Sequence, residues 1–440
     1  MPKLMNNKNT DSKPLNKKKS KFIFKSPKGM HDILPDDQYL WDRFLKNGKE
    51  TAEFYGYQKI ETPILEEMDV FLKTLGEESD VVEKEMFFVK GGGADKYVLR
   101  PEGTAAVCRA FIEHGMSHRP QPVKLWYVGP MFRREQPQAG RYRQFHQIGF
   151  EIIGGSIDPI YDAQVILASF RILEQAKIKN LTVNINSIGC RICRPHYRKR
   201  LVEYYKKHEK TLCADCKRRL KSNPMRLLDC KNSSCAPLKA KAPSLMDNIC
   251  VSCSSHLKLV LEYLDELSLP YVLNPHLVRG LDYYSKTVFE IFADQNPLAL
   301  ASGGRYDYLL EEMGSRPTPG TGSAIGIDRV IEQMKAQQVT PPKSSKEKIF
   351  FVYLGDIAKK KVLKIIEEFR KTNILTQESF GKDLIKRQMA LADKSEAQLA
   401  LILGQREVFE ETIIIRDLKS GLQETVPVTK VVDEVKKRLK

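Results

Sequence analysis

Fixed positive charges lie beside acidic residues in one short part of the chain, between residues 127 and 154. Arg133 and Glu135 come just before a polar connection that contains proline and glycine, and Arg141 and Arg143 come just after it. A planar guanidinium group can donate two hydrogen bonds at once to phosphate oxygens. The spacing therefore predicts a pocket for a phosphate-bearing ligand. The alternative is an edge hairpin whose charges are solvated.

The segments on either side of this connection predict a long antiparallel hairpin. Alternation in the second segment places Gln147 and Glu151 on one face and Ile148, Phe150 and Ile152 on the other. The apolar face can pack against a core. The carboxamide and the carboxylate then face the same pocket as the arginines.

A helix is predicted soon after Leu99, in the stretch LRPEGTAAVCRAFIEHG. Thr104 is expected to cap this helix, because a threonine side chain can accept a hydrogen bond from a free backbone N–H of the first turn. Glu102 lies just before the helix, where a carboxylate is also favoured by helix-start electrostatics alone.

Two further features follow between residues 277 and 304. Arg279 comes after an apolar pair and before Gly280, so we expect it to leave a strand end toward a cavity. A buried arginine needs a partner, and the alternative is a structural ion pair with Asp282. Gly303 and Gly304 are predicted to let a ligand approach the backbone closely.

Eight of the nine cysteines lie between residues 190 and 253, in four pairs. Three pairs are spaced C-x-x-C and one C-x-x-x-x-C, which is typical of tetrahedral Zn²⁺ sites. Disulfides are not expected in a reducing compartment. Structural zinc and free thiols both remain open, and the spacing does not say which pairs would share an ion. The candidate metal ligands are Cys213, Cys216, Cys230, Cys235, Cys250 and Cys253, and the remaining pair is Cys190 and Cys193.

The composition bounds the class of protein. With 440 residues, 42% of them hydrophobic, the chain is long enough for two or three domains with separate cores. The net charge of +17 suits a polyanionic partner, and residues 1–25 alone hold eight lysines and one aspartate. No run approaches the roughly 18 to 20 apolar residues of a membrane span. The N-terminus has no apolar signal region either, so we expect a cytoplasmic protein without a membrane partner.

The linker TPPKSSKEK, from Thr340, predicts a domain boundary. Beyond it, strand patterns alternate with helix patterns, which predicts a small, mostly parallel α/β domain.

Three stretches carry a resemblance to a known family. FRREQPQAGRYRQFHQ, residues 132–147, resembles motif 2 of the class II aminoacyl-tRNA synthetases as found in the histidine-tRNA ligase family. LVRGLDYY, residues 277–284, matches the histidine-specific signature of that family, and residues 318–334 resemble class II motif 3. The resemblance covers about residues 26–440.

The resemblance implies an α+β fold. A class II catalytic domain with an antiparallel sheet would occupy residues 26–340, with a Cys-rich insertion at about 190–256. A C-terminal α/β anticodon-binding domain would occupy residues 347–440, and residues 1–25 would be a disordered basic tail. A helix at 38–55 and a strand at 56–63 that ends at Pro63 would form motif 1, the interface of a homodimer.

The implied activity is ATP-dependent ligation of L-histidine to tRNA(His) through histidyl-adenylate, with Mg²⁺ on the β- and γ-phosphates of ATP. Arg133 and Arg279 would be catalytic and hold the α-phosphate and the carboxylate. The implied histidine-binding residues are Glu102, Gly103, Thr104, Arg133, Gln147, Glu151, Arg279, Tyr283, Tyr284 and Tyr306. The implied ATP-binding residues are Arg133, Glu135, Arg141, Arg143 and Arg329, and the acceptor end of tRNA would meet Gln138, Arg141 and Arg143.

Two other functions are weighed against this one. A histidine-ligase-like regulatory subunit of ATP phosphoribosyltransferase shares the fold but typically lacks the anticodon domain, and a non-catalytic RNA-binding protein would be favoured only by the charge. The sequence departs from the family in two places. Gln136 stands where many members carry a basic residue, and the family does not generally need zinc.

Overall fold

The computed structural model describes residues 24–75, 82, 85–90, 96–294, 296–339, 348–372, 374–381 and 384–439. The contacts divide the chain into two units, Met1–Pro341 and Pro342–Lys440. Most of the predicted basic tail and most of the predicted linker lie outside the described residues. Among the described residues, no helix combines the length and the apolar character needed to cross a bilayer.

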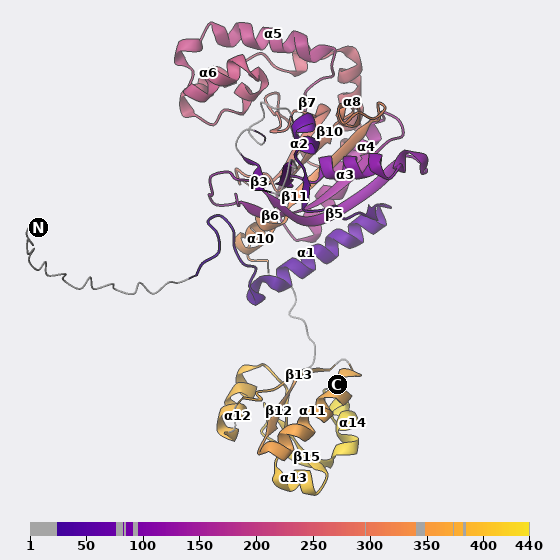
Figure 1. Ribbon diagram of the computed structural model, residues 1–440, viewed down its shortest axis with the longest axis vertical. Helices are drawn as coiled ribbons and strands as arrows, with labels where there is room; N and C mark the ends of the chain where they lie inside the picture. Colours follow the sequence, from indigo (N-terminus) through magenta and orange to yellow (C-terminus); the bar gives the residue numbers. More distant parts are fainter. Residues whose placement is uncertain are drawn as a thin grey trace, which may run out of the picture. The chain divides into compact units, whose positions relative to one another are not determined.

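The first unit is built on an eight-stranded sheet with the order β1-β5-β6-β11-β10-β9-β7-β8 (Figure 1). The inner pairings are antiparallel, and only the edge strands β1 and β8 pair in parallel with their neighbours. The strands are β1 (Gln58–Lys59), β5 (Val123–Phe132), β6 (Gln144–Ile153), β7 (Leu181–Ser187), β8 (Tyr271–Leu273), β9 (Ser285–Ala293), β10 (Ala301–Arg305) and β11 (Gly320–Gly326).

One face of this sheet packs against four helices: α1 (Pro35–Phe54), α4 (Pro159–Gln175), α8 (Val251–Glu266) and α10 (Ile327–Ala336). The predicted apolar face of the hairpin lies in this core, where Ile148, Phe150 and Ile152 are buried. Burial of these side chains fixes the register of β6, since a shift by one residue would exchange its two faces. The predicted hairpin is therefore confirmed as β5 and β6.

The other core of the first unit holds shorter elements. It contains α3 (Thr104–Glu113) and a three-stranded sheet with the order β2-β4-β3. The bounds of the elements around it are α2 (Met68–Leu75), β2 (Leu65–Glu67), β3 (Phe87–Lys90), β4 (Lys96–Leu99), η2 (Met116–His118) and α9 (Leu309–Glu312).

The predicted strand at 56–63 is much shorter in the structure, because β1 spans only Gln58–Lys59. The Ile60 N–H still donates to the Trp126 carbonyl. The Thr62 carbonyl, however, accepts from Arg100 Nη1 at 2.8 Å. The Arg100 side chain thus supplies the hydrogen bond that a neighbouring strand would otherwise donate to this carbonyl.

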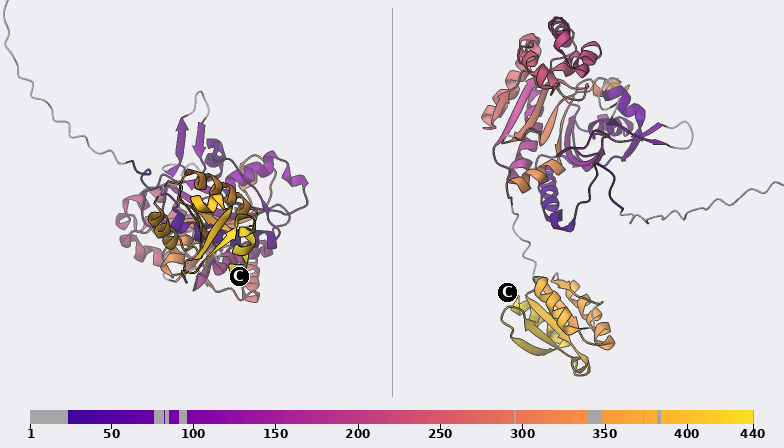
Figure 2. Two further views of the ribbon diagram at one scale, coloured as in Figure 1. Left: turned by 90° about the horizontal axis from the view of Figure 1, so that it is seen from below. Right: turned by 90° about the vertical axis from the view of Figure 1, so that its left-hand side faces the viewer.

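The Cys-rich insertion consists of short helices that gather at one end of the first unit (Figures 1 and 2). Its buried apolar side chains belong to the same core as α3 and include Tyr197, Leu201, Leu220 and Leu228. Its elements are α5 (Cys193–Lys206), η3 (Glu209–Thr211), α6 (Ala214–Lys221), η4 (Pro224–Asp229), η5 (Ser233–Cys235), α7 (Ala236–Ala240) and η6 (Met246–Asn248), after which α8 begins.

The second unit is a five-stranded sheet with the order β13-β12-β14-β15-β16. The prediction of a mostly parallel sheet was wrong, because β12 pairs in parallel with β13 and β14, but β14, β15 and β16 pair antiparallel. The connection between β15 and β16 is too short for a parallel crossover. The elements are β12 (Lys348–Tyr353), α11 (Asp356–Arg370), β13 (Leu375–Gln377), α12 (Ile385–Lys394), β14 (Leu399–Leu403), α13 (Gln405–Phe409), β15 (Thr412–Asp417), β16 (Gln423–Pro427), η7 (Val428–Lys430) and α14 (Val431–Arg438).

Candidate active site

A cavity of about 400 Å³ opens above the centre of the large sheet. Strands β6, β9, β10 and β11 contribute to its wall, together with the loop at 277–284 and part of the insertion. It brings together residues that are far apart in the sequence. The predicted site residues on its wall are Glu102, Arg133, Glu135, Arg141, Gln147, Arg279 and Arg329.

Arg133 lies just after the end of β5, where backbone and an aromatic ring fix its side chain. Its Nε donates to the Pro101 carbonyl at 3.0 Å. Its guanidinium carbon lies 5.3 Å from the centre of the Phe145 ring, which belongs to β6. A planar guanidinium stacked in this way is held in place and still has N–H groups to donate to a ligand.

Arg279 forms an ion pair with Glu290 of β9, and its Nη2 donates to Ser302 Oγ of β10 at 2.8 Å. The predicted alternative partner, Asp282, is not used. Asp282 instead accepts from Asn223 Nδ2 at 3.1 and 2.9 Å. Burial lowers the pKa of Arg279, but Glu290 and three weaker negative neighbours together raise it by more, so the net pKa lies above its usual range and the group stays charged.

Arg329 lies in the first turn of α10 and is held by backbone carbonyls. Its Nε donates to Gly140 at 2.8 Å and its Nη1 to Ala299 at 3.0 Å. Burial lowers its pKa, and repulsion by Arg133 and Arg141 lowers it further. Positive charge is thus concentrated in the cavity, and an anion bound there would relieve it.

The loop between β5 and β6 is closed by paired backbone bonds between Gln138 and Arg141. Arg141 Nη1 contacts Glu135 Oε2 at 3.2 Å, and both side chains line the cavity. Gln138 is exposed. Arg143 turns toward the Lys28 carbonyl (3.3 Å) and the Glu135 carbonyl (3.4 Å), and it is not on the cavity wall.

The start of α3 is capped by Glu102 rather than by Thr104. The two carboxylate oxygens of Glu102 accept from the backbone N–H groups of Thr104 (2.7 Å) and Ala105 (2.8 Å). The predicted cap was therefore wrong, because α3 already begins at Thr104 and the Thr104 N–H is itself one of the groups that Glu102 caps. Thr104 Oγ1 is left to donate to Glu151 Oε1 at 2.7 Å.

Glu151 lies behind Glu102 and is fully buried. Its second oxygen accepts from Tyr306 Oη at 2.6 Å. Burial raises the pKa of Glu151 to about 8, although the hydrogen bonds from Tyr306 and Thr104 oppose the shift. Burial also raises the pKa of Glu102. Two buried carboxylates side by side favour a cationic ligand.

The predicted histidine-binding residues thus fall into two sets. Glu102, Arg133, Gln147 and Arg279 are on the cavity wall. The others are buried and are not on this wall, and among them Tyr283 Oη donates to Glu102 Oε2 at 3.5 Å. This second set comprises Gly103, Thr104, Glu151, Tyr283, Tyr284 and Tyr306.

Sequence reasoning missed three residues near Arg279: Glu290, Ser302 and Arg226. Glu290 and Ser302 are direct partners in the β9–β10 register and point into the cavity together. The polar position within the apolar run KTVFEIFA was the available signal for Glu290. No pattern signalled Arg226, which reaches the cavity from the insertion.

Gly303 and Gly304 lie where strands of the large sheet pack closely, and the approach of a ligand to them stays a prediction. A Cβ atom at this position would lie 2.2 Å from the Gly322 carbonyl oxygen, and one at Gly304 would lie 2.5 Å from the Thr287 carbonyl oxygen. The two glycines therefore allow neighbouring strands to approach closely.

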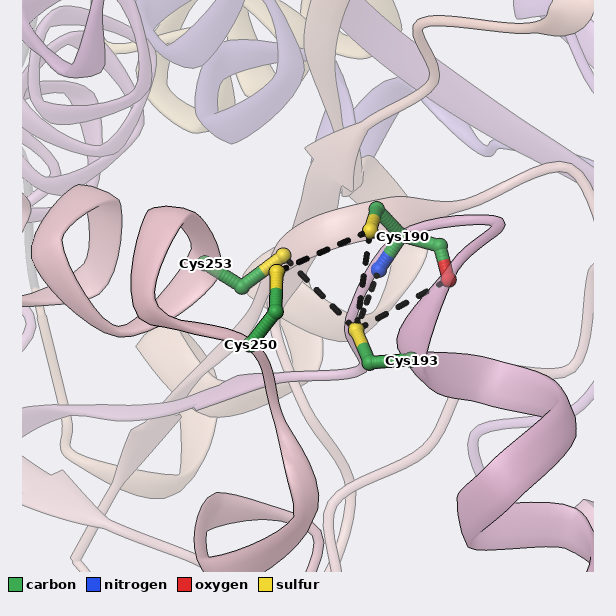
Figure 3. Close-up of side chains that lie close together, drawn as sticks. All are labelled: Cys190, Cys193, Cys250 and Cys253. Carbon is green, nitrogen blue, oxygen red and sulfur yellow. Dashed lines mark hydrogen bonds between the residues drawn. The ribbon is translucent and has the colours of Figure 1, made fainter.

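Eight cysteines form two groups of four sulfur atoms, and all nine cysteines of the chain are free thiols. One group unites Cys213, Cys216, Cys230 and Cys235. In the other, Cys250 and Cys253 meet Cys190 and Cys193, the pair that the predicted ligand set left out. Figure 3 shows these four sulfur atoms turned toward one another from the start of α5 and the start of α8.

Comparison with known proteins agrees with this geometry. A family model described as histidyl-tRNA synthetase matches residues 29–330, and one described as an anticodon binding domain matches residues 348–438. A histidine-tRNA ligase of Dehalococcoides mccartyi is 42% identical over 419 residues, which is 95% of this chain and 100% of that protein. One of Desulfitobacterium hafniense is 41% identical over 417 residues, 94% of this chain and 98% of that protein.

Two solved structures are also similar. The crystal structure of apo S. aureus histidyl-tRNA synthetase has a TM-score of 0.77 and 34% identity, and the match covers 94% of this chain and 100% of that one. An ATP phosphoribosyltransferase regulatory subunit/histidyl-tRNA synthetase from Bacillus halodurans has a TM-score of 0.63 at 23% identity, covering 87% and 99%, which is a likeness of fold alone. The family models and the relatives place the chain in the histidyl-tRNA synthetase family.

Proposed function

We propose that this chain ligates L-histidine to tRNA(His) in two steps. The histidine carboxylate attacks the α-phosphorus of ATP to form histidyl-adenylate and release diphosphate. The acyl group then passes to the terminal ribose of the tRNA and AMP leaves. One observation carries the proposal: Arg133, Arg279 and Arg329 line a single cavity with the carboxylate of Glu102.

The arginines suit the first step because it gathers negative charge around one phosphorus. Such a transfer depends on positioning and on charge stabilisation. Arg133 and Arg279 would hold the α-phosphate and the carboxylate from opposite walls, and Arg329 would hold the γ-phosphate. Glu135 and Arg141 would address the remainder of the nucleotide, with Arg143 at the margin of the loop.

Mg²⁺ is proposed to accompany ATP. It prefers oxygen ligands and is usually bound by one or two carboxylates together with substrate phosphates. Glu290 is taken by its ion pair with Arg279, so Glu135 is the carboxylate on the cavity wall that would hold such an ion together with the phosphates. When bound, the ion would neutralise charge on the β- and γ-phosphates.

The carboxylate end of the cavity suits histidine. Glu102 would accept from the α-ammonium group, with Gly103 and Thr104 beside it. Glu151, Tyr284, Tyr283, Tyr306 and Gln147 are the candidates to surround the imidazole. A pocket that pairs every polar group rejects analogues that lack those groups by roughly 10⁴- to 10⁵-fold, so no editing step is required.

The remaining assignments concern the tRNA and the assembly. Residues 26–340 would form the catalytic domain, with Gln138, Arg141 and Arg143 meeting the acceptor end. Residues 347–440 would bind the anticodon, as the match to an anticodon binding domain supports. We further propose a homodimer formed through residues 38–63, a cytoplasmic location where translation uses the charged tRNA, and structural zinc in the insertion.

Charging assays test the proposal directly. Purified protein, ATP and tRNA should yield aminoacylated product with histidine alone among a panel of amino acids, and should exchange diphosphate into ATP only with histidine. A chain that binds histidine but neither exchanges diphosphate nor charges tRNA would instead be a regulatory subunit. RNA binding without histidine-dependent exchange would leave only the non-catalytic alternative.

A further inference from the structure

The two cysteine groups have the dimensions of metal sites. Within each group the sulfur atoms all lie within 4.8 Å of one another. In the first group Cys190 lies 3.6 Å from Cys193 and 3.9 Å from Cys250, and Cys193 lies 3.8 Å from Cys253. In the second group the sulfur atoms of Cys213 and Cys230 are 3.9 Å apart.

These separations can be compared with a tetrahedral zinc shell. With Zn–S bonds of about 2.3 Å, neighbouring sulfurs in a regular tetrahedron lie about 3.8 Å apart. A disulfide would need about 2.05 Å. Each group therefore has the size that a four-thiolate Zn²⁺ site requires.

The insertion also needs a source of stability besides its apolar core. Its elements between residues 193 and 248 are mostly short, and four of them are 3₁₀ helices. A segment of this size buries little apolar surface, and metal binding is a common source of the missing folding free energy.

We propose that the chain binds two Zn²⁺ ions, one held by Cys190, Cys193, Cys250 and Cys253 and the other by Cys213, Cys216, Cys230 and Cys235, and that the second ion positions the loop of Arg279. The first ion closes the base of the insertion, because Cys190 follows β7 and Cys250 precedes α8. The metal sites rest on the sulfur geometry alone. The positioning role also rests on the proposed ligase activity.

The second ion ties together the two ends of residues 217–229, since Cys213 and Cys216 come before this segment and Cys230 and Cys235 after it. The segment lies on the loop at 277–284. Asn223 Nδ2 donates to both oxygens of Asp282, at 3.1 and 2.9 Å, and Arg226 Nη1 donates to the Arg279 carbonyl at 3.2 Å. A fixed insertion thereby fixes the backbone from which Arg279 reaches the cavity.

Metal analysis of the full-length protein tests the two sites. We expect about two zinc atoms per chain, and about one in either Cys190→Ser/Cys193→Ser or Cys213→Ser/Cys216→Ser. Cys108→Ser is the matched control, because Cys108 is a buried thiol outside both groups, and it should keep two. Less than about one zinc atom in the wild-type chain, or iron in its place, would overturn the proposal.

A thiol titration keeps the test decisive if a serine variant does not fold. Titration of the wild-type protein with a mercurial in the presence of a zinc indicator should release both ions as eight thiols react. Release that follows only one group of four thiols would refute the second site. Neither measurement depends on activity, so a failure of the metal sites is distinguishable from a failure of the ligase proposal.

The positioning role is tested by a double-mutant cycle in diphosphate exchange. Asn223→Ala should lower kcat by roughly 10- to 100-fold with little change in the KM for histidine, while two zinc atoms remain. Asp282→Ala should then have a smaller effect in the Asn223→Ala background than in the wild-type chain, because the two side chains share this contact. Losses that multiply, or a loss of stability without a change in kcat, would refute the role.

Discussion

Replacing Arg279 with alanine is the most direct perturbation of the cavity. The side chain spans two strands by pairing with Glu290 and donating to Ser302 Oγ at 2.8 Å, and it is only 17% exposed. Removal takes away a fixed, desolvated cation at the point where charge would develop. Loss of one such group typically costs about 10²- to 10³-fold in kcat, or about 3 to 4 kcal/mol.

Histidine-dependent diphosphate exchange measures this loss, and calorimetry of histidine binding without ATP measures the ground state. We expect exchange to fall by at least about 10²-fold while histidine still binds measurably. Arg279→Lys should recover only part of the loss, because an ammonium group keeps the charge but lacks the planar fork.

The matched control separates catalysis from structure. Arg279→Ala leaves the Glu290 carboxylate without its ion-pair partner in a partly buried position, which could by itself disturb the cavity. The variant Arg279→Ala/Glu290→Ala removes both charges. Exchange restored to near the wild-type rate in the double variant would show that Arg279 serves only the ion pair, and the reasoning would be refuted.

Three further predictions concern stability. Burial raises the pKa of Glu151 from 4.5 to about 8, so its contribution to the free energy of unfolding is complete below pH 4.5 and is lost as the pH rises to 8. Glu151→Gln should therefore flatten this part of the Tm-against-pH curve of the ligand-free protein. An unchanged slope would contradict the assignment. Arg305 and His256 together outweigh burial and lower the pKa of Asp162 to about 2, so its contribution to stability is complete above pH 3.8 and is lost as the pH falls to 2. Asp162→Asn should lower the free energy of unfolding by about 3 to 5 kcal/mol in urea denaturation at pH 7. A loss under about 1 kcal/mol would count against the pairing. Gly303→Ala should lower Tm by an amount equivalent to about 1 to 3 kcal/mol, because the new methyl group meets the Gly322 carbonyl oxygen. Gly381→Ala is the control and should leave Tm unchanged, because a Cβ atom at Gly381 has no other atom within 4 Å. Equal effects of the two substitutions would refute the steric argument.

The parts of the fold that follow a strict period were predictable from the sequence. The hairpin of β5 and β6 is an example, because alternation assigned Ile148, Phe150 and Ile152 to the core and Gln147 to the cavity. Periodicity reports which face of an element is buried. It does not report which backbone groups a distant side chain will take, and Arg100 shortened the strand that follows α1 in this way.

The candidate site, like the fold, was predictable from the sequence only in part. The arginines of the hairpin indicated a phosphate-bearing ligand, and only the family resemblance implied that Glu102 binds histidine. The partner of Arg279 could not be read from the sequence, because Glu290 and Ser302 are neighbours only through the β9–β10 register. The grouping of Cys190 and Cys193 with Cys250 and Cys253 likewise depends on the placement of α5 beside α8.

The charged groups of the cavity are in unfavourable electrostatic environments that bound substrates would improve. At one end Arg329 lies under the repulsion of Arg133 and Arg141, which lowers its pKa. At the other end burial raises the pKa of Glu102, so a proton is retained more readily there than in water. A phosphate relieves the first strain and an ammonium group the second. Because one cavity contains both ends, histidine and ATP bound together would relieve both at once. With Arg329 on the γ-phosphate and Glu102 on the ammonium group, as proposed, the site would be more complementary to the state in which the histidine carboxylate attacks ATP than to either substrate alone.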